Sequence, residues 1–150
     1  NLYSGVRRLF EPKKLICVLG ACGGGRDKWK RPILGNIASS YCDTIILTNE
    51  DPYDENPSQI LSEIKSGVSR SREPRPSWRG AESRDKLTVY EILDRREAIR
   101  KALSIAREGD VVVASGKGSE DAIAVAGGKK IPWDERKIIE EEFASLYKKA

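Results

Sequence analysis

The feature that most constrains the fold is a set of short, almost uninterrupted apolar runs, each followed by polar residues. Three of them read KLICVLGA at 14–21, DTIILT at 43–48 and DVVVAS at 110–115. Runs without polar alternation are typical of strands that are covered on both faces, as in parallel sheets. A shorter run, LTVYEI at 87–92, is a fourth candidate strand. The pattern therefore predicts an α/β fold with a mostly parallel sheet.

Segments with helical apolar spacing separate these strands, as a parallel sheet requires. Pro32 suits the first turn of a helix over about 32–41, and Pro57 opens the next one. Asp94 caps a third helix, which Gly109 stops. With 150 residues, the chain is long enough for one core and one domain, 1–150. We expect a single Rossmann-like domain with helices on both faces of the sheet.

The two ends of the chain add two helices and a hairpin. Residues 2–10 are periodic but have no capping residue before them, and 134–148 form a last helix behind Asp134. The run at 122–133 predicts a hairpin that turns at two glycines and supplies an antiparallel edge. The residues expected to face inward are Leu2, Val6, Leu9, Phe10, Ile33, Leu34, Ile37, Ala38, Ile60, Leu61, Ile64, Val68, Ala98, Ile99, Ala102, Leu103, Ala106, Ile138, Ile139, Phe143 and Leu146.

The glycine-rich loop GACGGGRDKWKRP, residues 20–32, follows the first strand and is a candidate ligand-binding segment. The dinucleotide fingerprint G-x-G-x-x-G fails here, because Cys22 or Lys28 occupies a glycine position. The phosphate-binding P-loop also fails, because Arg26 replaces its lysine. Three consecutive glycines still allow positive φ and a close backbone approach, and the basic residues offer anion contacts. The alternative is a tight strand-to-helix turn with solvated charges.

Three polar loops follow the strands, at 20–28, 48–57 and 115–121. Because the carboxyl ends of parallel strands meet at one edge of the sheet, these loops should converge there. Ligands of open α/β sheets bind at this edge. The sequence therefore predicts a binding site formed by the three loops.

Residue types exclude several kinds of site. The chain has no histidine, which removes Ser-His-Asp and Cys-His nucleophile systems and His-ligated metals. Its cysteines are Cys17, Cys22 and Cys42, an odd number without a CxxC pair. This pattern argues against a disulfide framework and a zinc site and favours reduced thiols.

Charge and hydropathy leave the partner open. The net charge of +4 permits an anionic partner, either a nucleotide or a nucleic acid. No apolar run approaches the roughly 20 residues of a membrane span, and no signal peptide opens the chain. We expect a soluble, cytoplasmic protein without a membrane partner.

Four stretches, in order and spacing, resemble the C-terminal domain of the Mur ligases. They are GACGGGRDKWKRPILGNIA, CDTIILTNEDPYDENP, DRREAIRKALSIAREGDVVVASGKGSE and IPWDERK. The resemblance covers nearly the whole chain and is weakest at 66–86. It is greatest to the tripeptide synthetases of the family, which add the third residue of the peptidoglycan stem peptide. It implies that residues 1–150 are the amino-acid-binding domain, and that the central ATPase and N-terminal UDP-binding domains lie outside this chain.

The resemblance also implies a reaction. Mur ligases use ATP to form an acyl phosphate on UDP-MurNAc-dipeptide, which the amine of the incoming amino acid then attacks. The C-terminal domain closes over the cleft, helps to hold ATP and binds the amino acid. The ligands of ATP and Mg²⁺ would lie mostly in the other domains. We therefore expect neither a catalytic residue nor a metal ligand in this chain, and no nucleic-acid partner.

The resemblance assigns roles to individual residues. Arg26, Gly116 and Glu120 match family positions that contact the amino acid. A guanidinium suits the substrate carboxylate, and a carboxylate suits its ammonium group. Asp27 and Lys28 would lie near the ribose and phosphates of ATP.

One departure bears on specificity. Diaminopimelate-adding relatives carry Asp-Asn-Pro-Arg after the second strand, where this chain has Glu50, Asp51, Pro52 and Tyr53. The arginine that would bind the distal carboxylate of diaminopimelate is thus missing, and the loop is acidic. Our hypothesis is an amino acid like lysine, with meso-diaminopimelate as the other candidate. The alternative is that the acids only cap the helix that Pro57 opens.

Two other functions remain open. The segment 70–84 combines arginines with Trp78, as surfaces that bind single-stranded RNA do, so a basic module binding RNA or a phosphorylated ligand is one alternative. The other is a different Mur-type ligase, such as folylpolyglutamate or cyanophycin synthetase. These enzymes share the domain architecture but not the stretch TNEDPYDENP.

Overall fold

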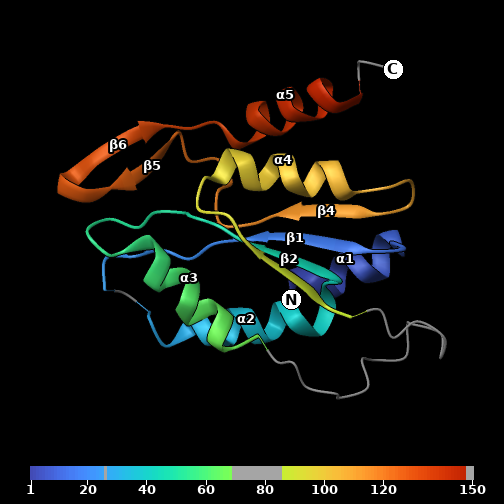
Figure 1. Ribbon diagram of the computed structural model, residues 1–150, viewed down its shortest axis with the longest axis horizontal. Helices are drawn as coiled ribbons and strands as arrows, with labels where there is room; N and C mark the ends of the chain where they lie inside the picture. Colours follow the sequence, from blue (N-terminus) through green and yellow to red (C-terminus); the bar gives the residue numbers. More distant parts are fainter. Residues whose placement is uncertain (26, 69–85, 148–150) are drawn as a thin grey trace.

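The computed structural model describes residues 1–25, 27–68 and 86–147, and its centre is a four-stranded parallel sheet (Figure 1). The strand order is β3-β2-β1-β4. The strands are β1 (Leu15–Leu19), β2 (Thr44–Leu47), β3 (Thr88–Glu91) and β4 (Val111–Ala114). Each predicted strand is present, and every pairing in this sheet is parallel. The expected α/β fold class is confirmed.

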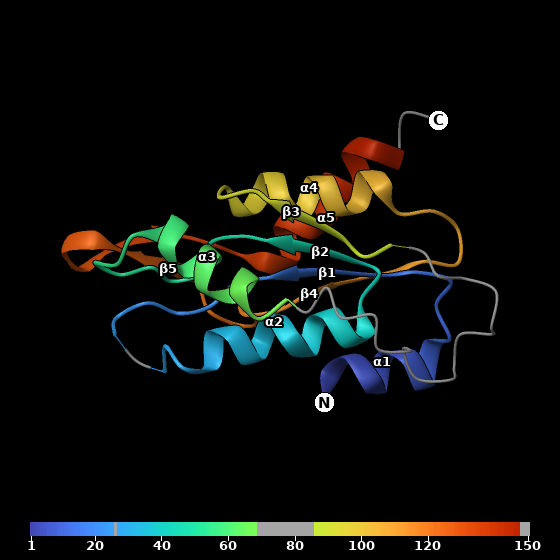
Figure 2. The same ribbon diagram turned by 60° about the horizontal axis from the view of Figure 1, so that its bottom comes forward.

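Helices cover both faces of the sheet, as Figures 1 and 2 show from two directions. One face carries α1 (Leu2–Phe10), α2 (Lys30–Tyr41) and α3 (Pro57–Ser66). The other carries α4 (Arg95–Ile105), with α5 (Glu135–Tyr147) packed on it. The side chains of β1 divide between the two layers: Leu15, Cys17 and Leu19 join the α1–α3 layer, while Ile16 and Val18 join the α4 layer. All five are buried, which explains the lack of polar alternation in this run.

The C-terminal hairpin forms where it was predicted but does not extend the parallel sheet. Its strands are β5 (Ala122–Val125) and β6 (Lys129–Pro132), joined through a short 3₁₀ turn, Ala126–Gly128. They make a separate two-stranded sheet. The backbone groups of β5 bond instead to the loop between β2 and α3, where Tyr53 N donates to Ala124 O over 3.2 Å. The hairpin therefore covers the loop rather than the sheet edge.

Helix α1 differs from the prediction in its cap and its buried face. The side chain of Asn1 accepts hydrogen bonds from the first turn, so the helix is capped. Leu9 and Phe10 are exposed, and so is Leu2. Arg7 is buried in their place, because its guanidinium bonds to the Asp43 carboxylate over 2.5 Å. The ion pair with Asp43, just before β2, thus determines which face of the helix is buried, and this cannot be predicted from the spacing of apolar residues.

Helix α5 shows the same kind of difference. Ile138 and Ile139 pack inward as predicted, but Phe143 is 54% exposed and Leu146 also faces outward. Glu142, next to Phe143, is buried instead, and two arginines of α4 bind it. Charge pairing between the two helices therefore decides which face of α5 is covered.

Smaller differences affect α2 and α4. Helix α2 begins at Lys30, two residues before the predicted start, and Ile33 is exposed while Arg31 and Gly35 are buried. Helix α4 begins behind its predicted cap, Asp94, and ends at Ile105, before the predicted Gly109 stop.

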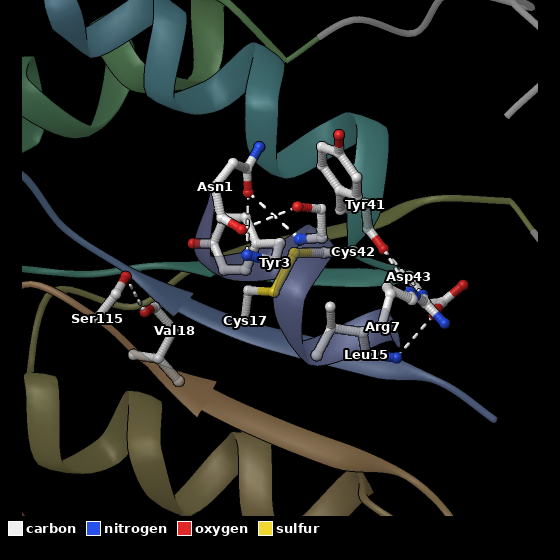
Figure 3. The surroundings of a disulfide bond; sticks show 11 residues. Asn1, Tyr3, Arg7, Leu15, Cys17, Val18, Tyr41, Cys42, Asp43 and Ser115 are labelled. Atoms are coloured by element: carbon white, nitrogen blue, oxygen red, sulfur yellow. Dashed lines mark hydrogen bonds and ion pairs between the residues drawn. A yellow bond between two sulfur atoms is a disulfide. The ribbon is translucent and has the colours of Figure 1, made fainter. Parts of the chain in front are cut away.

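Cys17 and Cys42 form a disulfide, so the expectation of reduced thiols is wrong for these two residues (Figure 3). Cys17 lies in the middle of β1, and Cys42 directly follows α2. The return from β1 through α2 to β2 brings their Cα atoms to 6.2 Å, although 25 residues separate them in sequence. Spacing along the chain cannot reveal this approach. Cys22 is a free, exposed thiol.

Two predictions concern residues outside the described ranges. One is the role of Arg26 in binding the amino acid. The other is the loop over 66–86, of which the greater part, including the whole basic segment 70–84, lies outside these ranges. Within the described ranges, no helix has the length and apolarity needed to cross a bilayer.

Candidate functional site

The carboxyl ends of β1, β2 and β4 border a cavity of about 730 Å³, where the three predicted loops meet. This size lies within the range of small-molecule sites. Its lining combines glycine backbone, two carboxylates, two cations and a few apolar side chains. The lining residues are Leu19, Gly20, Ala21, Cys22, Gly23, Gly24, Asp27, Lys30, Arg31, Leu34, Glu50, Tyr53, Ser115 and Gly116.

The glycine-rich loop lies directly against the loop that follows β2. Gly23 N donates to Asp51 O over 2.7 Å. A Cβ atom on Gly23 would lie 2.0 Å from Pro52 O, so no other residue type fits there without moving the backbone. Gly23 therefore serves the close packing of two loops at the cavity.

Arg31, at the start of α2, fastens these two loops together. Its guanidinium binds Glu55 at 3.0 and 3.2 Å, Glu63 at 2.6 Å and Cys22 O at 2.9 Å. Glu55 also accepts a hydrogen bond from Gly25 N. Bonding to Arg31, and then to Gly25, lowers the pKa of Glu55 to about 2. Glu55 is therefore ionised at neutral pH and is committed to holding the glycine loop.

Glu50 and Gly116 approach each other closely at the cavity. Gly116 has a φ of +100°, and a Cβ atom there would lie 2.2 Å from Oε2 of Glu50. Burial raises the pKa of Glu50, and the positive charges of Arg95 and Lys117 offset part of this rise. Glu50 is thus a partly desolvated carboxylate in the cavity wall, and it suits a cationic ligand group.

Asp51, predicted to bind the amino acid, is engaged within the protein. Both of its carboxylate oxygens accept from Lys117 Nζ, at 2.7 and 2.8 Å, and one also accepts from Ala124 N over 2.7 Å. The side chain of Lys117 is 1% exposed. The pair ties the β2–α3 loop to the loop after β4 and to β5, and Asp51 does not line the cavity.

The other acids of this loop also bond internally. Asp54 accepts from Gly127 N of the hairpin turn over 2.8 Å. Asn56, not an acid, caps α3, and its side chain accepts from Ser58 N. The alternative that the acids cap this helix is therefore not what the structure shows. Glu50 is the acid of the loop that faces the cavity.

The predicted site residues fall into three groups. Glu50, Tyr53, Gly116 and Asp27 line the cavity. Asp51 and Glu120 lie near its lining without belonging to it, and Glu120 accepts from Gly118 N over 2.8 Å. Lys28 is half exposed and pairs with Glu55 at 3.3 Å, and Arg26 lies outside the described residues.

Sequence reasoning missed Arg31, Lys117 and Arg95 as organisers of the site. Lys117 lies in GKG at 116–118, which fails as a phosphate-binding motif and so attracted no other role. Arg31 stands before a proline in a basic stretch, and Arg95 is one of many arginines. The position of an arginine at a helix start could have singled out Arg31 and Arg95, but no such signal marks Lys117.

The same region contains a set of possible metal ligands. The ligand atoms of Cys22, Glu50 and Asp51 lie within 4.8 Å of one another. Cys22 is exposed as a residue, but partial desolvation of its thiol and the two neighbouring carboxylates raise its pKa to about 11, so the thiol is protonated at neutral pH. The Lys117 ammonium already neutralises Asp51. This donor set does not fit a metal ion, and we assign none.

Comparisons with known proteins agree on one family. The family described as "Mur ligase, glutamate ligase domain" matches residues 1–118. Among curated proteins, the chain is 41% identical over 139 residues to a UDP-N-acetylmuramoyl-L-alanyl-D-glutamate–2,6-diaminopimelate ligase of Caldanaerobacter subterraneus, which covers 93% of this chain and 26% of that protein. A ligase of the same name from Cytophaga hutchinsonii is 36% identical over 148 residues, 99% of this chain and 27% of that protein.

A solved structure of a UDP-N-acetylmuramoyl-L-alanyl-D-glutamate–2,6-diaminopimelate ligase superposes with a TM-score of 0.77 at 30% identity. The match covers 96% of this chain and 26% of the solved one. The chain therefore spans about a quarter of the length of these relatives.

Proposed function

The chain belongs to the Mur ligase family, and from this we propose that it is the C-terminal, amino-acid-binding domain of an ATP-dependent ligase of peptidoglycan precursor synthesis. The ligase would add the third stem-peptide residue to UDP-MurNAc-dipeptide. The observation that carries the proposal is the cavity of about 730 Å³ at the carboxyl ends of β1, β2 and β4, with the Glu50 carboxylate in its wall. The central ATPase and N-terminal UDP-binding domains would complete the enzyme.

In this proposal the amino acid is held by charge at both ends. Glu50 binds a cationic amino group, and burial of Glu50 strengthens that attraction. Arg26, which follows Gly25 in the glycine-rich loop, binds the carboxylate, and Glu120 binds the other amino group. Asp51 acts indirectly, because it holds Lys117 and the loop that carries Gly116.

The contribution to the reaction is placement. Fixing the amine next to an activated carboxyl group converts an encounter of two molecules into a step within one complex. Closure of this domain over its partner domains would exclude water, which otherwise hydrolyses an acyl phosphate. Asp27 and Lys28 lie on the proposed ATP side. ATP and Mg²⁺ would supply the activation of the carboxyl group, with ligands mostly outside this chain.

The identity of the amino acid depends on Tyr53. The relatives are named for 2,6-diaminopimelate. In this chain Tyr53 lines the cavity beside Gly24, where diaminopimelate-adding relatives have arginine. A phenol cannot neutralise the distal carboxylate of diaminopimelate as a guanidinium does. We therefore favour a lysine-like substrate, with meso-diaminopimelate as the alternative.

Amino-acid selectivity of the full-length ligase tests this proposal. We expect lysine to be ligated to UDP-MurNAc-dipeptide with a kcat/KM at least about tenfold above that of meso-diaminopimelate, the value of one charge-assisted hydrogen bond. The variant Tyr53→Arg should shift the ratio toward meso-diaminopimelate, while Tyr53→Phe should not. A wild-type preference for meso-diaminopimelate would overturn the lysine assignment. Absence of ligation with any amino acid would overturn the function itself.

The alternatives have less support. The RNA-binding interpretation depends on residues 70–84, which lie outside the described ranges. Folylpolyglutamate and cyanophycin synthetases are not favoured, because the similar proteins described above are named diaminopimelate ligases, and their similarity extends over most of this chain.

A further inference from the structure

Arg95 joins the two strand ends that frame the cavity. Its Nη1 donates to Asn49 O over 3.2 Å, and its Nη2 donates to Ser115 O over 2.8 Å. Asn49 directly precedes Glu50, and Ser115 directly precedes Gly116. Strands β2 and β4 are not neighbours, because β1 lies between them, so their ends are two strand spacings apart, about 10 Å. The loops approach each other beyond the strand ends, so that one guanidinium reaches a carbonyl of each.

A carboxylate behind Arg95 fixes the guanidinium itself. Glu135, the first residue of α5, binds Nε over 3.0 Å and Nη2 over 2.6 Å, as a two-point pair. Trp133 Nε1 donates to the same carboxylate over 2.7 Å. The side chains of Arg95 and Glu135 are 1% and 5% exposed. Arg95 therefore connects the junction of β6 with α5 to the loops of the cavity by hydrogen bonds.

This arrangement is unfavourable on general grounds. Arg95 is the first residue of α4, where the helix dipole disfavours a cation. A buried ion pair also loses hydration that its attraction does not always replace. Neither helix stability nor burial accounts for an arginine here. Its planar fork of donors does, because Arg95 makes four hydrogen bonds, including a two-point pair with Glu135, whereas a lysine has three donors on a single nitrogen.

We propose that Arg95 is a positioning residue for the amino-acid site: it sets the separation of the β2 and β4 ends, and thereby the placement of Glu50 against Gly116. The inference rests on the proposed function for its substrate. Arg95 does not line the cavity, so it acts on the amino acid through these two loops. Glu135 acts one step further away, by holding Arg95.

Kinetics of the full-length ligase with Arg95→Lys test the proposal. We expect the KM for the amino acid to rise about tenfold, with kcat and the KM values for ATP and UDP-MurNAc-dipeptide within about twofold of wild type. Arg96→Lys is the matched control. Arg96 is the next residue of α4 and also pairs with α5, through Glu141 and Glu142, but it does not line the cavity. We expect Arg96→Lys to leave all KM values unchanged.

Glu135→Gln provides a second, milder variant in case Arg95→Lys does not fold. This variant keeps Arg95 and its two carbonyl partners but replaces the carboxylate with a neutral amide. We expect the amino-acid KM to rise about threefold. An amino-acid KM that stays at the wild-type value in both variants would overturn the proposal. So would an equal rise for all three substrates, because that pattern indicates general loss of structure.

Hydrogen exchange separates this inference from the proposed function, because it needs no activity. In the full-length protein, amides of 49–53 and 115–118 should exchange at least about tenfold faster in Arg95→Lys than in Arg96→Lys. Equal exchange in the two variants would overturn the positioning role even in an active enzyme. A wild-type enzyme without amino-acid-dependent ligation would overturn only the proposed function, and the exchange result would still decide the role of Arg95.

Discussion

At the scale of single residues, the cavity depends on a glycine that leaves room for a carboxylate. Gly116 combines a φ of +100° with a would-be Cβ contact of 2.2 Å to Glu50 Oε2. The backbone conformation disfavours a side chain, because the left-handed region is strained for other residues, and a Cβ atom would displace the Glu50 carboxylate. The glycine after β4 is therefore a spatial requirement of the site.

Gly116→Ala tests this requirement. We expect the free energy of unfolding to fall by about 1–3 kcal/mol from strain at positive φ, and amino-acid binding to weaken because Glu50 is displaced. Urea denaturation of the chain measures the first effect. Gly118→Ala is the control, since its Cβ would meet only Glu120 Oε2 at 3.9 Å, and we expect a change within about 0.5 kcal/mol. Equal losses in the two variants would contradict the account.

Residue chemistry explains which part of the site could be predicted. The loops themselves follow from strand ends, and Glu50, Tyr53, Gly116 and Asp27 line the cavity that these loops form. The partners of Asp51 could not be predicted, because Lys117 reaches it from 66 residues further along the chain. The sequence shows that the loop is acidic, but only the structure shows which of its carboxylates already have partners within the protein.

At the scale of elements, strands were more predictable than helix faces. A buried strand requires an apolar run, so β1 and β2 appear directly in the sequence. The faces of α1 and α5 follow instead from ion pairs of buried residues, Arg7 with Asp43 and Glu142 with the half-exposed arginines of α4. Such pairs join segments far apart in the chain, and apolar periodicity does not detect them.

The disulfide is the covalent counterpart of this long-range pairing. It fastens β1 to the end of α2 across 25 residues, next to the segment that carries the glycine loop. Closing a loop of this length is worth about 3 kcal/mol. We expect dithiothreitol to lower the free energy of unfolding by about that amount, measured by urea denaturation.

Two variants control the disulfide prediction. Cys22→Ala should respond to dithiothreitol as wild type does, since Cys22 is free. The double variant Cys17→Ala and Cys42→Ala should not respond. Titration of three free thiols in the unreduced, denatured chain would contradict the bond.

At the scale of the whole molecule, the chain is organised around one edge of its sheet. Three sets of contacts hold the loops there: the Arg31–Glu55 pair, the Lys117–Asp51 pair and the contacts of Arg95. Each contact restrains backbone near the cavity, which pre-organises the site before any ligand arrives. This pre-organisation is consistent with the proposed role of the cavity in holding an amino acid.

The most direct test of this account is the KM for the amino acid in the full-length ligase with Glu50→Gln. Loss of a charge-assisted hydrogen bond in the cavity should raise that KM about tenfold to hundredfold, while the KM for ATP stays within about twofold. Asp54→Asn, an acid of the same loop that bonds Gly127 N, should change neither value. An unchanged amino-acid KM in Glu50→Gln would contradict the claim that this cavity binds the amino acid.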